Sequence, residues 1–151
     1  MTQPMQAAPA ATRLTHLIKR IEMAVRARME EVLRPHGVSP PQYAALSILE
    51  QRGGLSSAQL ARRHFVTPQA ANQMIALLER DRLIERRPYP VNRKVLRAWL
   101  TERGKDVLEK CDQAVGELEE QMLAGLTTTE ALEFRQSLER TLTALARIGT
   151  D

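Results

Sequence analysis

The stretch from Leu55 to Gly104 constrains the fold of this chain more than any other part of the sequence. Ser56 and Thr67 stand where helix N-caps are expected, and Pro68 takes the first position of the second helix. The turn-forming run 88–94 then separates two strand-like runs, as in a hairpin. A short helix, a turn, a second helix and a hairpin in this order predict a winged helix-turn-helix, which places one helix in a DNA major groove.

Positive charge is concentrated in the same part of the chain. From Arg52 to Lys105 there are 12 Lys and Arg residues against 4 Asp and Glu, whereas the rest of the chain has 10 against 14, and the net charge is +4. A basic block between acidic helices indicates a polyanion as the partner of that block. The aromatic content of 3% argues against proteins that stack the bases of a single strand, so we expect double-stranded DNA.

Long amphipathic helices are expected on both sides of the winged segment. Apolar residues at helical spacing mark about 12–35 and about 102–148, and the winged helix-turn-helix occupies about 39–100. We therefore predict a mainly α fold with a small β-wing, one domain over 12–151, and a homodimer in which the outer helices bury their stripes. Residues 1–11, rich in Pro, Ala and Gln, are expected to be a disordered tail.

The sequence shows no pattern typical of an enzyme or of a cofactor site. His16, His36 and His64 lack metal-ligand spacing, and neither a Gly-rich phosphate loop nor a nucleophile elbow is present. Cys111 falls on an apolar helical stripe, which indicates a buried structural thiol. We expect no enzymatic activity, no cofactor and no metal. No stretch approaches the roughly 20 apolar residues of a membrane span, and no secretory signal is present, so we expect a cytoplasmic protein without a membrane partner.

The residues expected to contact DNA lie on the second helix, at the end of the helix before it and on the hairpin. Gln and Asn side chains pair with adenine, a capping Thr holds a phosphate, and an arginine at the hairpin tip, here Arg93, enters the minor groove. The alternative is an ordinary solvated polar face, with the cations at the helix end favoured by the helix dipole. The predicted DNA-binding set is Arg62, Arg63, His64, Thr67, Pro68, Gln69, Asn72, Gln73, Arg86, Asn92, Arg93, Lys94 and Arg97.

The chain resembles the MarR family of bacterial transcription regulators from about Leu14 to Ile148. The segments that carry the resemblance are LSSAQLARR, VTPQAANQMIALLERDRLIERRP and LTERGKDVL. The resemblance implies a triangular homodimer, a palindromic operator and a repressor released by a small aromatic or anionic effector. It also implies an effector pocket between the dimer helices and the winged domain.

Two positions depart from the family pattern. Asn92 stands where the family has an acidic residue before the wing-tip arginine, and an amide holds Arg93 less firmly than a carboxylate does. Arg82 stands where the family favours Gly after the second helix, so Arg82 is expected either to adopt a positive φ or to end that helix differently.

A ligand site is expected where the first and second helices meet the fifth. His16 and Tyr43 offer polar-tipped rings and Arg20 offers a cation, a combination that suits an aromatic carboxylate. The alternative is that Tyr43 belongs to the core while His16 and Arg20 face water. For the whole chain there are two alternative functions: a DNA-independent dimeric scaffold for protein contacts, and a small helical enzyme. The clustered arginines of the winged segment disfavour the first, and the lack of a convergent polar site disfavours the second.

Overall fold

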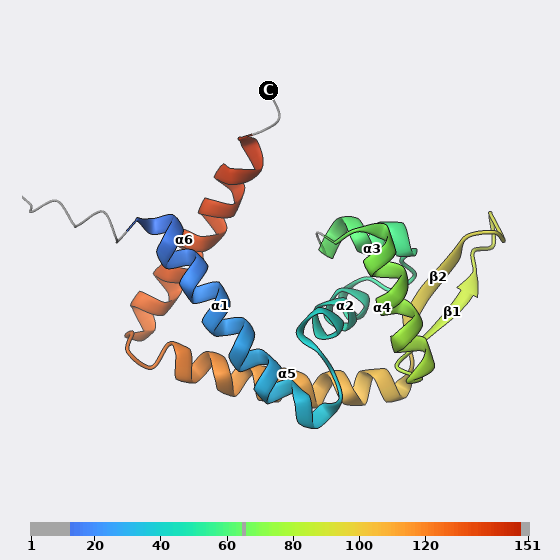
Figure 1. Cartoon of the computed structure of the whole chain (residues 1–151), viewed down its shortest axis with the longest axis horizontal. Coiled ribbons are helices and arrows are strands. Elements are labelled where there is room, and N and C mark those ends of the chain that lie inside the picture. The colour runs from blue at the N-terminus through green and yellow to red at the C-terminus, as the bar shows by residue number, and fades with distance from the viewer. Residues whose placement is uncertain (1–12, 65, 149–151) are drawn as a thin grey trace, which may run out of the picture. The chain divides into compact units, whose positions relative to one another are not determined.

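The computed structural model describes residues 13–64 and 66–148, and within them the predicted order of helices and strands is confirmed (Figure 1). The elements are α1 (Leu14–Leu33), the 3-10 helix η2 (Arg34–His36), α2 (Pro40–Gln51), α3 (Ser57–His64), α4 (Pro68–Arg80), β1 (Ile84–Pro88), β2 (Leu96–Leu100), α5 (Glu102–Met122) and α6 (Thr128–Arg147). The predicted tail 1–11 lies outside the described residues.

The chain divides into two compact units, and the boundary follows Val115, inside α5. The first contains α1 to α4, the hairpin and the first part of α5, and the second contains the rest of α5 and α6. Both fall within the region that the sequence predicts as one domain. None of the helices in the described part of the chain is long and apolar enough to cross a membrane.

The core of the first unit gathers apolar side chains from each of its α-helices. Leu33 of α1, Leu46 of α2, Leu60 of α3 and Leu108 of α5 are fully buried. The buried face of α4 consists of Ala71, Met74, Ile75 and Leu78, which lie at helical spacing. Cys111 is buried in the same cluster, and burial raises the pKa of its thiol. Both findings agree with a structural thiol, because a reactive cysteine needs exposure and a lowered pKa.

Hydroxyl side chains cap the starts of α2 and α6. Ser39 Oγ accepts from the backbone N–H of Gln42 at 3.3 Å, while the Gln42 side chain accepts from the Ser39 N–H at 2.9 Å. Thr127 and Glu130 form the same reciprocal pair at the start of α6. Each cap satisfies N–H groups that have no partner within the helix, so these residues fix where the helices begin.

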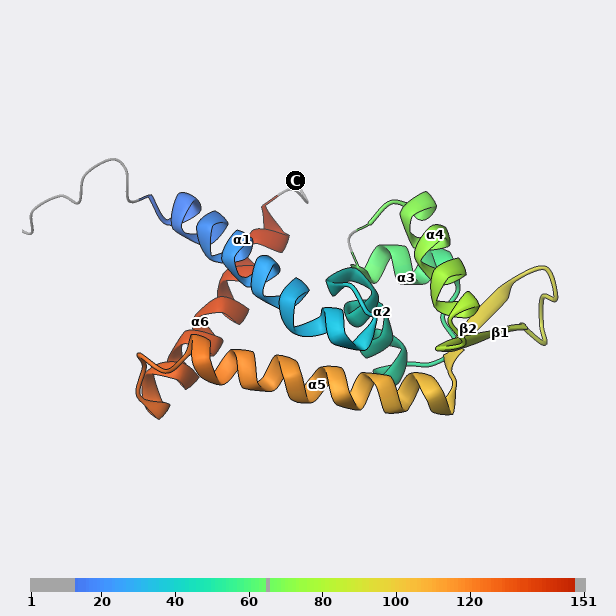
Figure 2. The same ribbon diagram turned by 60° about the horizontal axis from the view of Figure 1, so that its bottom comes forward.

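The two strands pair antiparallel, with Arg87 opposite Arg97 and Glu85 opposite Trp99. The root of this hairpin packs on the turn after α2, where Gly53 and Gly54 lie against the Trp99 ring. A Cβ at Gly53 would come within 2.8 Å of Trp99 Cδ1, and Gly54 has a φ of +74°, so both positions require glycine. Figure 2 shows α3 beside α4 and the hairpin following α4.

The turn after α4 is fastened to the start of α5. Arg82 has a φ of 61°, which confirms one of the two outcomes expected for a non-glycine residue at this position. Thr101 Oγ1 donates to the Arg82 carbonyl at 2.6 Å and accepts from the Gly104 N–H at 2.9 Å. Gly104 leaves no room for a side chain, because a Cβ there would collide with the Leu83 carbonyl. The exit of α4 and the first turn of α5 therefore share one set of hydrogen bonds.

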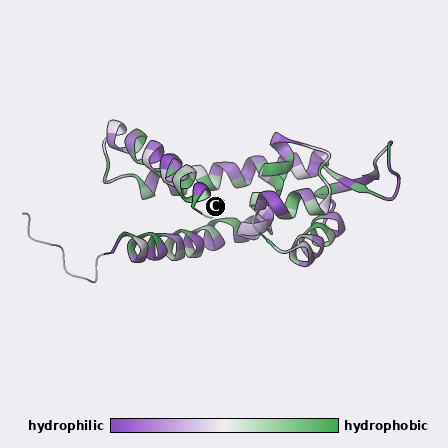
Figure 3. Cartoon of the chain, turned by 90° about the horizontal axis from the view of Figure 1, so that it is seen from above, coloured by the Kyte–Doolittle hydropathy of each residue, from purple (hydrophilic) through white to green (hydrophobic). Residues whose placement is uncertain are grey.

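Apolar side chains remain exposed along the outer helices of this single chain. They lie at helical spacing, and Figure 3 shows hydrophobic residues interleaved with hydrophilic ones along these helices. On α1 they are Leu14, Leu17, Ile18 and Ile21, and on α6 they are Leu132, Phe134, Leu138, Leu142 and Leu145. Contiguous apolar stripes of this kind are typical of surfaces that bind another protein chain.

Candidate nucleic-acid interface

The first turns of α4 present a polar face to solvent. Gln69, Asn72 and Gln73 lie at spacings of three and four residues and are all exposed. The opposite side of α4 is its buried face, so core packing fixes the rotation of the helix about its axis. The three amide side chains are therefore held outward together, where they can pair with base edges.

The N-terminus of α4 offers donors for a phosphate. Thr67 Oγ1 accepts from the Ala70 N–H at 3.1 Å, and its own hydroxyl hydrogen remains able to donate. Pro68 has no N–H, so Gln69 contributes the first backbone N–H of the helix that has no partner among the described residues. Together with the positive end of the helix dipole, these groups favour an anion.

The end of α3 supplies two exposed cations. Arg62 and Arg63 lie in its last turn, are exposed, and form no ion pair among the described residues. His64 differs from them: its Nε2 lies 2.9 Å from the Pro41 carbonyl oxygen, which joins the end of α3 to the start of α2. Of these three predicted contacts, the geometry leaves Arg62 and Arg63 available to phosphates and gives His64 an internal partner.

Asn92 organises the tip of the hairpin. Its side-chain oxygen accepts from the Lys94 N–H at 3.2 Å, and its backbone oxygen accepts from the Val95 N–H at 3.0 Å. The amide thus holds the turn rather than the Arg93 side chain. Arg93 and Lys94 are both exposed at the tip, as expected for residues that reach toward DNA.

Arg86 has a different role from the one expected of it. Its Nε and Nη2 donate to the two carboxylate oxygens of Glu79, each at 2.9 Å, and so join β1 to α4. The Arg86 guanidinium holds the pKa of Glu79 below its ordinary range, and Glu79 raises the pKa of Arg86. The guanidinium of Arg86 is therefore occupied by Glu79 and holds the hairpin against α4. Its predicted contact with DNA has no geometric support.

Two arginines of the hairpin stack on aromatic rings. The Arg97 guanidinium lies 3.6 Å from the centre of the Tyr89 ring, and the Arg87 guanidinium lies 4.7 Å from the Trp99 ring. Arg97 belongs to the predicted DNA-binding set, whereas the roles of Tyr89 and Trp99 were missed. The signal in the sequence is a ring two residues after an arginine in each arm of the hairpin, and it becomes meaningful only when the strand register is known.

No hydrogen bond or ion pair in the described part of the chain links the three predicted ligand residues, and Tyr43 has a partner of its own. Tyr43 is half-buried, and its hydroxyl donates to Asp112 Oδ1 at 2.6 Å, joining α2 to α5. Burial, and then this hydrogen bond, raise the pKa of the Tyr43 hydroxyl. His16 and Arg20 are exposed on the first half of α1, and no hydrogen bond or ion pair among the described residues joins either of them to Tyr43.

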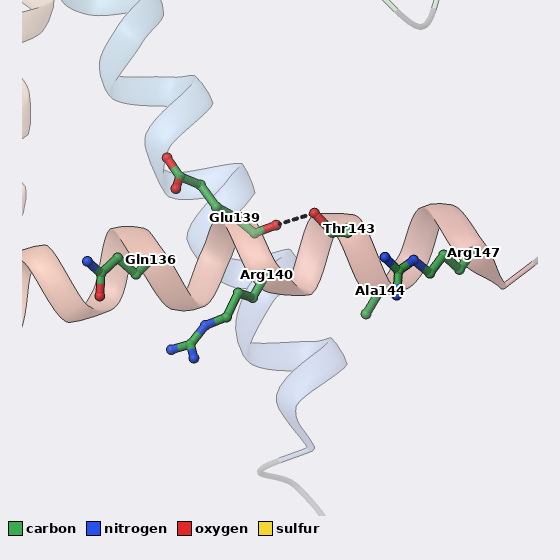
Figure 4. Close-up of a pocket in the computed structure, with 6 residues that line it drawn as sticks. All are labelled: Gln136, Glu139, Arg140, Thr143, Ala144 and Arg147. Carbon is green, nitrogen blue, oxygen red and sulfur yellow. Dashed lines mark hydrogen bonds between the residues drawn. The ribbon is translucent and has the colours of Figure 1, made fainter.

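One shallow hollow lies on α6 alone and is lined by polar and charged side chains (Figure 4). Its lining residues are Gln136, Glu139, Arg140, Thr143, Ala144 and Arg147. Thr143 Oγ1 donates to the Glu139 backbone oxygen at 3.1 Å, a bond within the helix. All six residues come from one helix face, so the hollow is part of the polar side of α6 and adds nothing to the interface.

Known proteins resemble this chain in sequence and in fold. The sequence model of the MarR family matches residues 36–94. The HTH-type transcriptional repressor Rv2887 of Mycobacterium tuberculosis is 34% identical over 127 residues, which are 84% of this chain and 91% of the repressor. The crystal structure of the M. tuberculosis MarR family protein Rv2887 in complex with DNA has a TM-score of 0.75 at 32% identity and covers 86% of this chain and 98% of its own. The complex of Rv2887 with p-aminosalicylic acid has a TM-score of 0.73 at 33% identity, with the same coverage.

Proposed function

This chain belongs to the MarR family of transcription regulators, and we propose that it is a homodimeric repressor that binds a palindromic site in double-stranded DNA. The observation that carries the proposal is the division of α4 into a buried face and an exposed amide face. A surface helix held by its core in this way presents a fixed row of donors and acceptors, as reading of a major groove requires.

Phosphate contacts would position α4 on the duplex. Arg62 and Arg63 lie just before it, and the Thr67 hydroxyl and the Gln69 N–H stand at its start. Such contacts orient a protein without reading sequence, and they make its affinity depend on salt. Sequence preference would then come from the amide side chains of α4 and from the hairpin tip.

The apolar stripes on α1 and α6 support the homodimer. Each protomer of a dimer binds one half-site, and two recognition helices in successive major grooves are about 34 Å apart. A second copy of the chain would cover the exposed leucines and isoleucines of the outer helices and set that separation. Light scattering at micromolar concentration tests this step, because a stable folded monomer of 17.0 kDa would contradict it.

We further propose that a small aromatic or anionic ligand releases the repressor. Support comes from the complex of the relative Rv2887 with p-aminosalicylic acid, an aromatic carboxylate. His16, Arg20 and Tyr43 remain the proposed ligand residues. A ligand that binds the Tyr43 hydroxyl would either replace its hydrogen bond to Asp112 or add a second hydrogen bond to it. A thermal-shift screen of phenolic acids on the wild type, Tyr43→Phe and His16→Ala tests this, since equal stabilisation of all three would remove these residues from the site.

A gel-shift assay tests the main proposal. The probe is the DNA upstream of the protein's own gene, and the competitor is a scrambled duplex of the same composition. We expect the upstream DNA to be retained in the presence of excess scrambled DNA, and the Gln69→Ala variant to lose that preference. Gln136→Ala, which changes an exposed amide on α6, is the matched control. Equal binding of both duplexes by the wild type would favour a scaffold that does not read DNA.

A further inference from the structure

An apolar side chain stands out at the tip of the hairpin. Val91 is 84% exposed, more than any other large hydrophobic residue in the described part of the chain. Most of the other exposed ones lie on the outer helices α1, α5 and α6, where a second copy of the chain would cover them. Val91 lies instead in the loop between β1 and β2, within the basic winged segment, so dimerisation does not account for its exposure.

Hydrogen bonds fix the backbone of this loop. The Tyr89 N–H donates to the Val95 carbonyl at 2.8 Å and closes the base of the loop. The Val95 N–H donates to the Asn92 carbonyl at 3.0 Å and forms a tight turn directly after Val91. Pro90, directly before Val91, has a fixed φ. Val91 is therefore presented from a closed loop, which stands clear of α3 and α4 (Figure 2).

Val91 and Arg93 can reach the same stretch of a groove. The Asn92 side chain between them folds back onto the Lys94 N–H, whereas Val91 and Arg93 are both exposed. Cα atoms two residues apart are separated by at most about 7 Å, which is about two steps of a duplex at ~3.4 Å each. A minor groove that receives Arg93 therefore has Val91 close to the same base pairs. The β-branched side chain of valine is stiff about χ1, so it presents one shape to the groove.

The minor groove offers one chemical difference that an apolar side chain can detect. A·T and T·A pairs present only acceptors there, and a G·C pair adds the amino group of guanine, which is a hydrogen-bond donor. Valine has no acceptor for this donor. A valine methyl group pressed against the amino group would displace its water and leave a buried donor without a partner, which is costly. An A·T pair has only a C–H bond at that place, so contact with it carries no such cost.

We propose that Val91 selects A·T pairs beneath the hairpin tip by excluding the guanine amino group from the minor groove. This inference rests on the proposed function, because the base pairs are those of the bound operator. Val91 acts differently from Arg93, whose charge responds to the negative potential of a narrow groove and is screened by salt. Val91 carries no charge, so its contribution to base preference should be independent of salt.

The base pairs beneath the tip are located first. Hydroxyl-radical footprints of the DNA upstream of the gene are compared for the wild type and Arg93→Ala at saturating protein. We expect Arg93→Ala to lose protection of one minor-groove segment beside each half-site. A footprint that Arg93→Ala leaves unchanged would overturn the proposal, because the tip would then not enter a groove.

Base analogues then isolate the amino group. Duplexes with A·T, inosine·C, G·C or 2,6-diaminopurine·T in the located segment are compared by fluorescence anisotropy. Inosine·C has the major-groove edge of G·C without the minor-groove amino group, and diaminopurine·T has the major-groove edge of A·T with that group added. The wild type should bind A·T and inosine·C alike, and should bind the two amino-bearing duplexes about ten-fold more weakly.

Variants at position 91 test whether the valine is responsible. Val91→Ser places a hydroxyl acceptor at the tip, so the difference should fall below about two-fold. Val91→Ile keeps an apolar tip and should retain the full difference. The matched control is Met23→Ser, which removes an exposed apolar side chain among charged residues of α1 and should bind all four duplexes like the wild type. A ten-fold difference retained by Val91→Ser would overturn the proposal and leave groove width, sensed by Arg93, as the cause.

Salt distinguishes the two tip residues independently. The ratio of affinities for A·T and G·C duplexes is measured for the wild type at about 50 mM and about 200 mM salt, over which all affinities fall. An unchanged ratio supports contact by Val91, and a ratio that declines at the higher salt would assign the preference to Arg93.

Failure of this inference and failure of the proposed function give different results. A wild type that does not prefer the upstream DNA to a scrambled duplex contradicts the proposed function. A wild type that prefers the upstream DNA, together with a Val91→Ser variant that responds to the four duplexes in the same way, refutes the role of Val91 alone. Circular dichroism of each variant separates loss of base preference from loss of the fold.

Discussion

Arg86 grips both carboxylate oxygens of Glu79, and this one pair joins the first strand of the hairpin to the recognition helix α4. The pair is partly exposed, so solvent screens it, but its two parallel hydrogen bonds fix the geometry that a single contact leaves loose. The orientation of the hairpin relative to α4 therefore depends on an ion pair as well as on core packing.

Breaking this pair should destabilise the protein modestly and in a pH-dependent way. Glu79→Gln is expected to lower the free energy of unfolding by about 0.5–1 kcal/mol at pH 7. The folded-state pKa of Glu79 lies below its ordinary value of 4.5, so its contribution is present above that value and is lost as the pH falls through the folded pKa. Urea titrations of wild type and variant at pH 7 and pH 3 check this, and a difference that grows at low pH would contradict it.

The bond between Tyr43 and Asp112 should stabilise the junction of α2 and α5. Tyr43→Phe keeps the ring in the core and removes the donor, so a loss of about 0.5–1.5 kcal/mol is expected. Because the pKa of Tyr43 is raised on folding, its contribution is full below the ordinary tyrosine value of 10.0 and declines as the pH rises beyond it. Thermal unfolding at pH 7 and pH 10.5 measures both effects, and Tyr89→Phe on the exposed hairpin is the control.

Glycine at position 82 should stabilise the fold. Arg82 holds a φ of 61°, a conformation that costs a side-chain-bearing residue about 1 kcal/mol. Arg82→Gly is expected to raise the free energy of unfolding by a few tenths to about 1 kcal/mol, since the greater freedom of glycine in the unfolded chain offsets part of the gain. Arg80→Gly, inside α4, should instead cost about 1 kcal/mol. Denaturant titration of the pair would refute the assignment of strain if both variants lost stability.

Two glycines of the same helix should respond oppositely to alanine. At Gly104 a methyl group would collide with the Leu83 carbonyl, so Gly104→Ala should cost about 1–3 kcal/mol. At Gly116 no atom lies within 4 Å of the added carbon, so Gly116→Ala should stabilise α5 by about 0.5–1 kcal/mol. Melting temperatures that move in the same direction for both would contradict this contrast.

The amide face of α4 should set base preference. Gln69→Ala or Asn72→Ala is expected to reduce discrimination at one base pair of the operator by about 1–3 kcal/mol and to change binding to random DNA little. Arg62→Ala should weaken binding to every duplex and reduce its salt slope by about 0.9 per phosphate lost. Competition between the operator and its single-base variants distinguishes the two classes of residue.

Local features of the sequence correctly predicted most of the fold. The buried face of α4 follows from its 3.6-residue period, and the caps at Ser39, Thr67 and Thr127 follow from side chains that act on N–H groups three residues away. The family's preference for Gly at position 82 left two outcomes open for Arg82, and the structure shows the positive φ. These features depend on neighbours in the chain.

What the sequence could not reveal depends on contacts between distant residues. Asp112 is 69 positions from Tyr43, and no local pattern joins them. Arg86 and Arg87 look equivalent in the sequence, yet strand alternation sends one toward Glu79 and the other onto Trp99. A shift of register by one residue would exchange their roles. Only the pairing of β1 with β2 therefore shows that Arg86 binds Glu79 and that Arg87 lies on the surface.

The hydroxyl of Thr101 serves as a joint between the exit of α4 and the entry of α5. These two hydrogen bonds tie the residue that follows α4 to the first turn of α5, so each segment restrains the other. Serine at this position would keep both hydrogen bonds but lose the β-branch that restricts rotation about χ1. The γ-methyl group of Thr101 therefore adds rigidity to the junction of α4 and α5 beyond what the two hydrogen bonds supply.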